Sequence, residues 1–246
     1  MTTEARPLRG KRALVTGGAR RIGRGLATAL ARAGADVAIT YRGSVNEAEQ
    51  TAMDLGGFGV KALAVGMDVH HEWSVERAVE DAILGLGGLD ILVNNAGRFE
   101  TEALEKIKVA QWDEMFATNT RGPFLVAKHA YAQLKRARGR IVNIGSLGGL
   151  HPWSTHAHYC TSKAAVHMLS QTMAKAWAPE ISVNCVAPGM IVTTGEISSG
   201  YEQFAQKTPM KRNGTVEDVA AAVLFFATCP NFITGQLLAV DGGLGL

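Results

Sequence analysis

The sequence predicts an α/β protein built on a doubly wound parallel sheet with helices on both faces. Short apolar runs alternate along the whole chain with longer stretches of helical periodicity, which is the order expected of repeated βαβ units. One of these runs, 90–93, is apolar throughout its centre, as a strand buried on both faces is. Because no linker, repeat or low-complexity tract interrupts the pattern, we expect residues 1–246 to form a single domain.

Composition narrows the class of protein. At 246 residues and 47% hydrophobic content, the chain is long enough to bury a large core. Its net charge of +3 is too small to favour a nucleic-acid partner, and no apolar run approaches the roughly 20 residues that span a bilayer. The three cysteines, Cys160, Cys185 and Cys229, are scattered and lack metal-ligand spacing, which is typical of reduced thiols. We expect a cytoplasmic protein that binds neither nucleic acid nor membrane.

The first structural unit begins after a polar lead-in over residues 1–9. A short β-rich run, 12–16, is followed at once by a turn from Gly17 to Gly23 and then by a helical pattern that stops at Gly34. Strand, glycine turn and helix are the start of a nucleotide-binding unit, because glycines let the backbone approach a diphosphate at the helix N-terminus. A purely structural turn is the alternative.

The second predicted strand, 36–41, indicates which dinucleotide binds. An NAD site usually has Asp or Glu near the end of this strand, where it binds the ribose 2′-hydroxyl. Here the strand runs into Tyr41-Arg42-Gly43-Ser44, without a carboxylate. Arg42, Ser44 and Arg20 offer cations and a hydroxyl for a 2′-phosphate. The sequence therefore favours NADP(H).

Periodicity also predicts the remaining elements. The segment 112–135 reads as a helix that breaks or bends near Gly122 and Pro123, just past Asn119, whose side chain should either hydrogen-bond or face water. Residues 194–212 have weak periodicity, which suggests a mobile lid. Further helices are expected over 47–55, 74–86 and 216–227, and further strands over 60–65, 90–93, 140–145, 181–187 and 236–240.

A possible acid–base pair follows the strand 140–145. Helical periodicity runs from Thr161 onward, so Tyr159 and Lys163 lie one turn apart on one helix face. An ammonium group beside a tyrosine stabilises the phenolate and lowers its pKa towards a catalytically useful range. Ser146, at the tip of the preceding strand, can face the same cleft.

These motifs occur in a characteristic order and spacing along the chain. Each motif is weak alone, but their joint arrangement resembles the short-chain dehydrogenase/reductase family over essentially the whole sequence. The motifs are Thr16-Gly17 with Gly23, Asp68-Val69, Asn94-Asn95-Ala96-Gly97, Asn119, Ser146, Tyr159-x-x-x-Lys163 and Pro188-Gly189-x-x-x-Thr193.

The resemblance implies a single Rossmann-type dinucleotide-binding and catalytic domain with a seven-stranded sheet, usually as a homotetramer, and hydride transfer with NADP(H). Tyr159 would be the general acid in reduction, and Ser146 would orient the substrate carbonyl. Lys163 would bind the nicotinamide ribose and lower the pKa of Tyr159, while Asn119 would hold a water against Lys163. The implied cofactor-binding residues are Gly17, Arg20, Arg21, Ile22, Gly23, Tyr41, Arg42, Ser44, Asp68, Val69, Asn95, Ala96, Gly97, Tyr159, Lys163, Pro188, Gly189, Ile191 and Thr193.

One branch of the family suggests a pterin substrate. Arg21 stands where most members have glycine, and together with the residues 41–44 and Arg98-Phe99 it is similar to pteridine reductases. That branch typically has Asp at the position of Ser146, because pterin reduction delivers a proton to a ring nitrogen. Ser146 suits a carbonyl substrate better, so dihydropterin reduction is the alternative.

The other branch is 3-oxoacyl-carrier-protein reductase, which has the same four catalytic residues. Such enzymes dock an acidic carrier on basic residues, for which Lys135, Arg136 and Arg138 are candidates. The position before the strand 181–187, often basic in those enzymes, is Pro179-Glu180 here. We expect first a general NADPH-dependent reductase of a small carbonyl or acyl-thioester substrate.

Two further interpretations compete with catalysis by these residues. His151, His156 and His158 crowd the segment before Tyr159, but they lack a supporting carboxylate or cysteine pattern, so a pocket-lining loop is favoured over a metal site. The other alternative to an enzyme is an NADP-binding sensor or scaffold without turnover. The presence of all four catalytic residues, Asn119, Ser146, Tyr159 and Lys163, favours an active enzyme.

Overall fold

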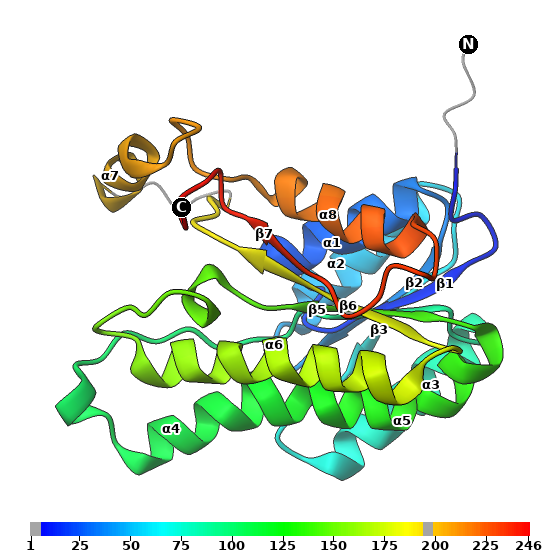
Figure 1. Ribbon diagram of the computed structural model, residues 1–246. Coiled ribbons are helices and arrows are strands. Elements are labelled where there is room, and N and C mark those ends of the chain that lie inside the picture. Colours follow the sequence, from blue (N-terminus) through cyan, green and yellow to red (C-terminus); the bar gives the residue numbers. More distant parts are fainter. Residues whose placement is uncertain (1–5, 194–198) are drawn as a thin grey trace.

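The computed structural model describes residues 6–193 and 199–246. Its strands form one seven-stranded sheet of order β3-β2-β1-β4-β5-β6-β7, with every pair of neighbours parallel (Figure 1). This confirms the predicted fold class. The strands are β1 (Arg12–Val15), β2 (Asp36–Tyr41), β3 (Ala62–Gly66), β4 (Ile91–Asn94), β5 (Arg140–Ile144), β6 (Ser182–Pro188) and β7 (Leu237–Val240).

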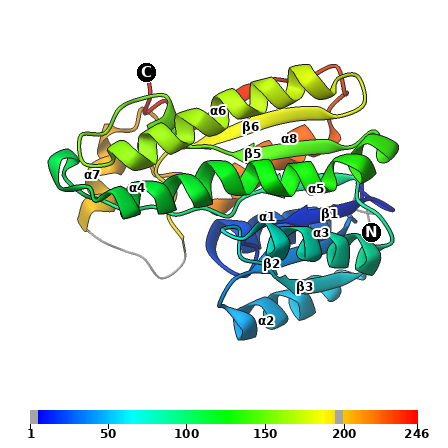
Figure 2. The same ribbon diagram turned by 90° about the horizontal axis from the view of Figure 1, so that it is seen from below.

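Helices cover both faces of the sheet (Figures 1 and 2). On one face α1, α2 and α8 pack over strand residues such as Val15 and Ile39, and on the other α3, α5 and α6 pack over residues such as Leu14 and Leu92. Adjacent residues of one strand thus enter opposite cores, which explains the unbroken apolar runs. The helices are α1 (Arg21–Arg32), α2 (Val45–Gly56), α3 (Glu72–Leu86), α4 (Val109–Phe116), α5 (Gly122–Ala137), α6 (Ala157–Trp177), α7 (Ser199–Lys207) and α8 (Val216–Thr228), with short 3-10 turns η1 (Leu104–Lys106) and η3 (Leu147–Gly149).

The strand order contains one reversal, between β1 and β4. From β1 the chain moves outward through β2 to β3, and then crosses back to form β4 on the other side of β1. Ligands of open parallel sheets bind beyond the carboxyl ends of the strands, beside such a reversal. Here that edge carries the turns that contain most of the predicted site residues.

The helical segment before β5 is not continuous. A π-helical turn, η2 (Ala117–Arg121), joins α4 to α5, and in it the Gly122 N–H donates to the Ala117 carbonyl, five residues back. Pro123 lies in the first turn of α5, where its missing N–H costs nothing. The predicted break is therefore confirmed in place, and Asn119 within the wide turn is buried, not solvated.

Three local expectations need correction. Residues 1–9 were expected to be a loose lead-in, yet Leu8 is buried and its N–H donates to the Ala33 carbonyl at 2.9 Å, because its apolar side chain packs at the end of α1. The helix that carries Tyr159 begins at Ala157, ahead of the periodic run. Within 194–212 the structure has α7, while residues 194–198 of the expected lid lie outside the described residues. None of the described helices is long and apolar enough to cross a membrane.

Candidate active site

The glycine turn after β1 leaves no room for side chains between itself and α1. Gly17 adopts φ 64°, and a Cβ built on Gly23 would overlap the Gly17 carbonyl oxygen and lie 2.5 Å from Asn95 Nδ2. The turn leads directly into the N-terminus of α1, and the positive end of a helix dipole attracts anions. This backbone cradle fits the diphosphate of a dinucleotide.

Arg21 occupies a backbone conformation that suits glycine. Its φ is 51°, in the left-handed region, which costs a residue with a Cβ about 1–2 kcal/mol. The resembled family usually has glycine here, so the arginine is held at a cost in backbone strain. Arg20 and Arg21 are both exposed, while Ile22 packs against the core under α1.

Thr16 joins the glycine turn to the turn after β4. Its Oγ1 accepts hydrogen bonds from the N–H groups of Asn95 at 3.0 Å and Ala96 at 2.9 Å. The Asn95 Nδ2 in turn donates to the carbonyls of Thr16 at 2.9 Å and Gly17 at 3.2 Å. The Asn95 side chain is therefore held by hydrogen bonds to the backbone of the glycine turn and helps to fix the shape of the cradle.

The end of β2 presents a cation and a hydroxyl. Arg42, directly after Tyr41, is exposed, and Ser44 at the start of α2 makes no capping hydrogen bond with its side chain. After the neighbouring β3, the Asp68 carboxylate accepts a hydrogen bond from the His70 N–H at 3.0 Å, and Val69 is buried. The chemistry of residues 41–44 therefore fits a phosphate better than a ribose hydroxyl.

Ser146 and Tyr159 meet at the same edge. Ser146 follows β5 and is buried, and its Oγ accepts a hydrogen bond from the Gly148 N–H at 3.1 Å. Tyr159 lies in the first turn of α6 and is half-buried, and the Ser146 hydroxyl is near enough to lower its pKa. The two hydroxyls that the sequence predicted to share a cleft are thus neighbours.

The pKa of Tyr159 moves in the opposite direction to the expected one. Burial raises it above its ordinary value of 10, and the Ser146 hydroxyl opposes this only in part. Lys163 does not offset burial, because its Nζ donates to the Ile144 carbonyl at 2.8 Å and lies 6.0 Å from the tyrosine ring centre. Tyr159 therefore carries its proton at neutral pH, which is the form that a general acid needs.

Asn119 and Lys163 converge on Gly97. A Cβ on Gly97 would lie 3.4 Å from Asn119 Oδ1 and 3.6 Å from Lys163 Nζ. The Asn119 Oδ1 accepts from the Arg98 N–H at 2.7 Å, and its Nδ2 donates to the Arg98 carbonyl at 3.0 Å and to Ser162 Oγ at 2.9 Å. Asn119 thus ties the turn after β4 to α6. Its role in holding a water against Lys163 stays a prediction.

Aromatic rings surround Tyr159. Phe99 meets the tyrosine ring edge-on, with centroids 4.9 Å apart and planes at 83°, and Trp153 stacks on it at 6.0 Å and 18°. His156 lies against Phe99 at 4.9 Å and Trp153 at 5.5 Å, and burial lowers its pKa, which favours the neutral ring. The wall beside the tyrosine is therefore apolar and uncharged.

The nearby histidines do not form a metal cluster. No group of three or more His, Cys, Asp or Glu among the described residues is arranged to hold a metal ion. His158 is fully buried, and neither of its ring nitrogens has a hydrogen-bond partner. His151 is exposed at the end of η3.

The turn after β6 contains the last group of predicted site residues along the chain. Pro188 ends β6, and a Cβ on Gly189 would lie 2.8 Å from the Cβ of Asp241, so glycine allows the ends of β6 and β7 to meet. Ile191 is half-buried against the core of the α1 and α8 face, and Thr193 is buried. All the predicted site residues therefore lie on the carboxyl edge of one sheet.

Two residues enter the site that the sequence did not assign to it. Ser162 Oγ donates to the Tyr159 carbonyl at 2.7 Å and accepts from Asn119 Nδ2. In the sequence, only the position of Ser162 next to Lys163 indicates that it belongs to the site. Trp153 stacks on the tyrosine ring.

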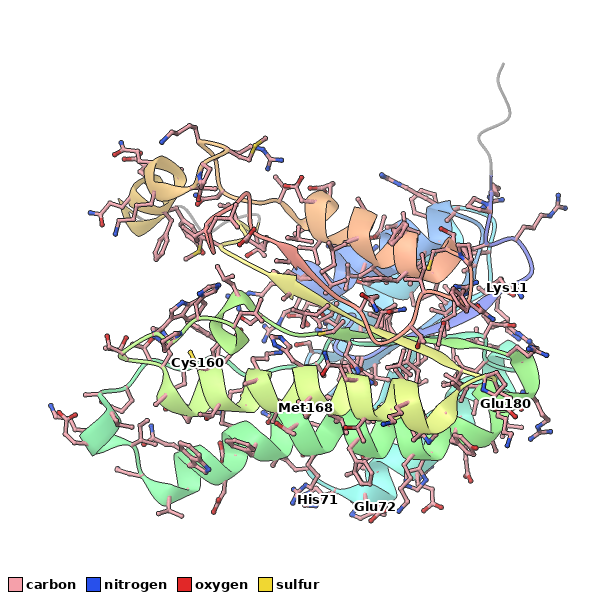
Figure 3. The ribbon with its side chains drawn as sticks, in the orientation of Figure 1. Lys11, His71, Glu72, Cys160, Met168 and Glu180 are labelled. Atoms are coloured by element: carbon pink, nitrogen blue, oxygen red, sulfur yellow. The ribbon has the colours of Figure 1, made fainter. Side chains whose placement is uncertain are left out.

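The basic residues considered for carrier docking lie at the wrong end of the molecule. Lys135 and Arg136 end α5 and Arg138 follows it, whereas the site adjoins the start of this 16-residue helix, about 24 Å away at the rise of an α-helix. Lys135 Nζ is 3.7 Å from Glu180, and Figure 3 shows Glu180 at the opposite end of α6 from Cys160. These residues are therefore remote from Tyr159, which lies in the first turn of α6.

Lys163 gives a prediction for stability. Burial lowers its pKa from 10.5 to about 8, so the charged lysine destabilises the folded chain by about 3 kcal/mol below pH 8. Between about pH 8 and 10.5 the unfolded chain holds the extra proton, so stability rises with pH and this cost disappears. We expect the advantage of Lys163→Met over the wild type in unfolding free energy to shrink by about 2–3 kcal/mol from pH 7 to pH 10. Urea unfolding at both pH values measures it, and a pH-independent difference would contradict the assignment.

Known proteins match the chain along its whole length. The family model described as enoyl-(acyl carrier protein) reductase matches residues 17–245. The 3-oxoacyl-(acyl-carrier-protein) reductase FabG of Staphylococcus epidermidis is 36% identical over 240 residues, which cover 95% of this chain and 98% of that protein. A short-chain dehydrogenase from Burkholderia cenocepacia, solved in complex with NADP, is 37% identical with a TM-score of 0.90, covering 98% of this chain and 100% of that one. A blue fluorescent protein from a metagenomic library, solved with NADPH, is 34% identical with a TM-score of 0.92 and the same coverage.

Proposed function

The chain belongs to the short-chain dehydrogenase/reductase family, and from the site that its residues build we propose an NADP(H)-dependent reductase of a small carbonyl substrate with Tyr159 as its general acid. The observation that carries the proposal is that the Ser146 and Tyr159 hydroxyls interact at the same edge of the sheet as the glycine cradle. A substrate carbonyl placed between these hydroxyls and a dinucleotide bound at the cradle would receive a proton from one side and a hydride from the other.

Each residue has a separate task in this step. Ser146 would donate a hydrogen bond to the carbonyl oxygen, because its lone pairs already accept from the Gly148 N–H. Tyr159 would transfer its proton to that oxygen as the carbonyl carbon is reduced. Lys163 would replace the transferred proton, since its ammonium group is buried beside the tyrosine, 6.0 Å from the ring centre. The bound dinucleotide supplies the hydride.

The cofactor is NADP(H). The solved relatives from Burkholderia cenocepacia and the metagenomic library hold NADP and NADPH, and in this chain Arg42 and Ser44 follow β2 where an NAD site has a carboxylate. Arg20 and Arg21 border the same cradle and are exposed. We propose that these four side chains bind the 2′-phosphate.

Arg42→Asp tests this assignment. We expect the ratio of kcat/KM with NADPH to that with NADH to fall about 10²-fold, because a charge-assisted hydrogen bond is lost and an acid now faces the phosphate. Steady-state rates with both cofactors measure the ratio. Arg77→Asp is the matched control, since Arg77 is exposed on α3 and pairs only at 3.8 Å with Asp81; an equal fall there would remove Arg42 from the site.

The substrate side of the site favours a small apolar ketone. Phe99 and Trp153 pack on Tyr159 and the adjacent His156 is neutral, so the wall offers apolar contact and no charge. Ser146 suits carbonyl oxygen, whereas dihydropterin reduction, the second candidate, is supported by the residues Arg21 and Phe99. A 3-oxoacyl thioester remains a substrate candidate through the relative FabG, although Lys135, Arg136 and Arg138 would not present its carrier.

The deciding experiment is NADPH oxidation by the purified protein with four substrates. These are a small diketone, an acetoacetyl thioester, a crotonyl thioester and dihydrobiopterin. Turnover of the first two supports the proposal, and turnover of the crotonyl thioester alone would assign C=C reduction instead. Turnover of the pterin alone would mean that Arg21 and Phe99 outweigh Ser146. NADPH binding without turnover of any substrate would favour a sensor or scaffold.

We further propose a homotetramer in which the outer face of α4, α5 and α6 is buried. Met168, labelled in Figure 3, is 62% exposed there. Trp112 and Phe124 are partly exposed, and Trp112 stacks on Phe116 at 5.2 Å. Large exposed apolar patches mark interfaces between subunits. Light scattering tests the assembly, and a monomer at working concentration would exclude it.

The remaining proposals concern the whole chain. One sheet runs through the described residues, which supports a single dinucleotide-binding and catalytic domain over residues 1–246. A cytoplasmic location is supported by the buried free thiols of Cys160, Cys185 and Cys229.

A further inference from the structure

His167 is a buried polar residue that the proposed mechanism does not use. It lies one turn beyond Lys163 on α6, so Tyr159, Lys163 and His167 form one stripe at positions i, i+4 and i+8. The side chain is only 9% exposed. A buried imidazole at the end of a catalytic stripe needs a physical reason, because burying a polar group costs free energy unless it is hydrogen-bonded.

The ring of His167 packs on the backbone that carries Ser146. Its Nε2 accepts a hydrogen bond from the Ser146 N–H at 3.4 Å. A Cβ on Gly145 would overlap the ring, lying 2.7 Å from its Cδ2, and a Cβ on Gly149 would lie 2.5 Å from its Cε1. The two glycines that flank Ser146 in the turn after β5 therefore leave space that the imidazole fills.

Lys163 and His167 together hold this turn at two points. Lys163 Nζ donates to the Ile144 carbonyl at 2.8 Å, and His167 Nε2 accepts from the Ser146 N–H. The Ile144 carbonyl directly precedes Gly145 and the Ser146 N–H directly follows it. The backbone on both sides of this glycine is therefore hydrogen-bonded to α6. The Ser146 Oγ accepts from the Gly148 N–H and acts on the pKa of Tyr159, so its position depends on the backbone that carries it.

We propose that His167 is a positioning residue for Ser146, acting through the unprotonated Nε2 that binds the Ser146 backbone. The inference rests on the proposed carbonyl reduction, in which Ser146 orients the substrate. A shift of the Ser146 hydroxyl by a fraction of an ångström would misalign the carbonyl, and misplacement by about 1 Å can cost 10²-fold in rate.

The surroundings keep His167 in the accepting form. Burial and the Lys163 charge lower its pKa to about 4, opposed only in part by the Gly149 backbone. The other titratable group at this place is the Cys185 thiol on β6, whose pKa burial raises to about 11. The imidazole of His167 is therefore neutral at pH 7. Its Nε2 accepts the hydrogen bond from the Ser146 N–H, and its ring hydrogen is assigned to Nδ1.

A double-mutant cycle tests the coupling. We expect His167→Leu to lower kcat/KM for the carbonyl substrate about tenfold or more, while the NADPH dissociation constant stays within about twofold. His167→Gln, which keeps an acceptor, should retain more activity than His167→Leu. In the Ser146→Ala background, His167→Leu should cost less than about twofold further, because the group that it positions is absent. Equal losses in both backgrounds would overturn the proposal.

A second readout does not depend on turnover. Amide hydrogen exchange of the segment 144–150 should be faster in His167→Leu than in the wild type, and unchanged in Leu84→Met, the control at an exposed position of α3. Unchanged exchange in His167→Leu would overturn the positioning role. If Ser146→Ala itself left turnover unaltered, the proposed function would fail, and the exchange result would still decide whether His167 holds the turn.

Discussion

Replacing Tyr159 with phenylalanine is expected to lower kcat about 10³-fold, within the range that general acid catalysis supplies. The ring contacts with Phe99 and Trp153 at 4.9 Å and 6.0 Å do not involve the hydroxyl, so the variant should fold and bind cofactor. Only the proton donor and its interaction with the Ser146 hydroxyl are lost. Single-turnover reduction with NADPH, together with cofactor binding by fluorescence, separates the chemical step from binding.

Tyr131→Phe is the matched control for this variant. Tyr131 lies on α5 against Trp177, with ring centroids 5.2 Å apart, far from the glycine cradle, and we expect its turnover to stay within about twofold of the wild type because surface changes away from the site have small effects. If Tyr159→Phe kept wild-type turnover, Tyr159 would not be the acid. If the wild type itself bound NADPH without turnover, the sensor or scaffold alternative would hold.

Gly23→Ala should have the second large effect, on both folding and cofactor binding. Its Cβ would overlap the Gly17 carbonyl oxygen and lie 2.5 Å from Asn95 Nδ2. Both atoms are part of the hydrogen-bonded cradle and cannot yield without breaking the 3.2 Å bond between them. We expect a loss of about 2–3 kcal/mol in unfolding free energy, in the range of forced overpacking, and NADPH affinity at least about tenfold weaker, since the displaced cradle is the diphosphate site.

Gly56→Ala provides the control for that substitution. A Cβ on Gly56 meets nothing within 4 Å, and the residue lies in the last turn of α2. Alanine is favoured over glycine in helices by about 0.5–1 kcal/mol, so this variant should be slightly more stable and bind NADPH normally. Urea unfolding and cofactor titration of the pair give the result. Equal behaviour of Gly23→Ala and Gly56→Ala would show that the cradle tolerates a side chain.

The sequence predicted the sheet and the edge at which the site lies, because both depend on local patterns. Apolar runs buried on both faces, such as 90–93, specify parallel strands, and strand order then brings Gly17, Asn95 and Ser146 to one edge. The i, i+4 spacing of Tyr159 and Lys163 was enough to place them on one face of α6. These statements require only periodicity and the geometry of parallel strands.

The sign of a pKa shift, the distance between a residue and the site, and a backbone angle could not be predicted from sequence patterns. The Lys163 ammonium was expected to lower the pKa of Tyr159, but its hydrogen bond to Ile144 and the burial of Tyr159 reverse the sign. Lys135 was a candidate for docking an acidic carrier, yet helix length places it at the far end of α5 from the site. The positive φ of Arg21 could be inferred only from the family position of a glycine. Each depends on tertiary contacts that a sequence pattern does not contain.

The π turn between α4 and α5 places a polar group in the core without disturbing the packing on either side of it. A single π turn accommodates one extra residue while the helices on either side keep their own phase. Asn119 is therefore buried within the π turn, while Met115 of α4 and Val126 of α5 keep their buried places in the flanking helices. The polar residue enters the core through a local change in helix geometry, and no apolar side chain of the packing is displaced.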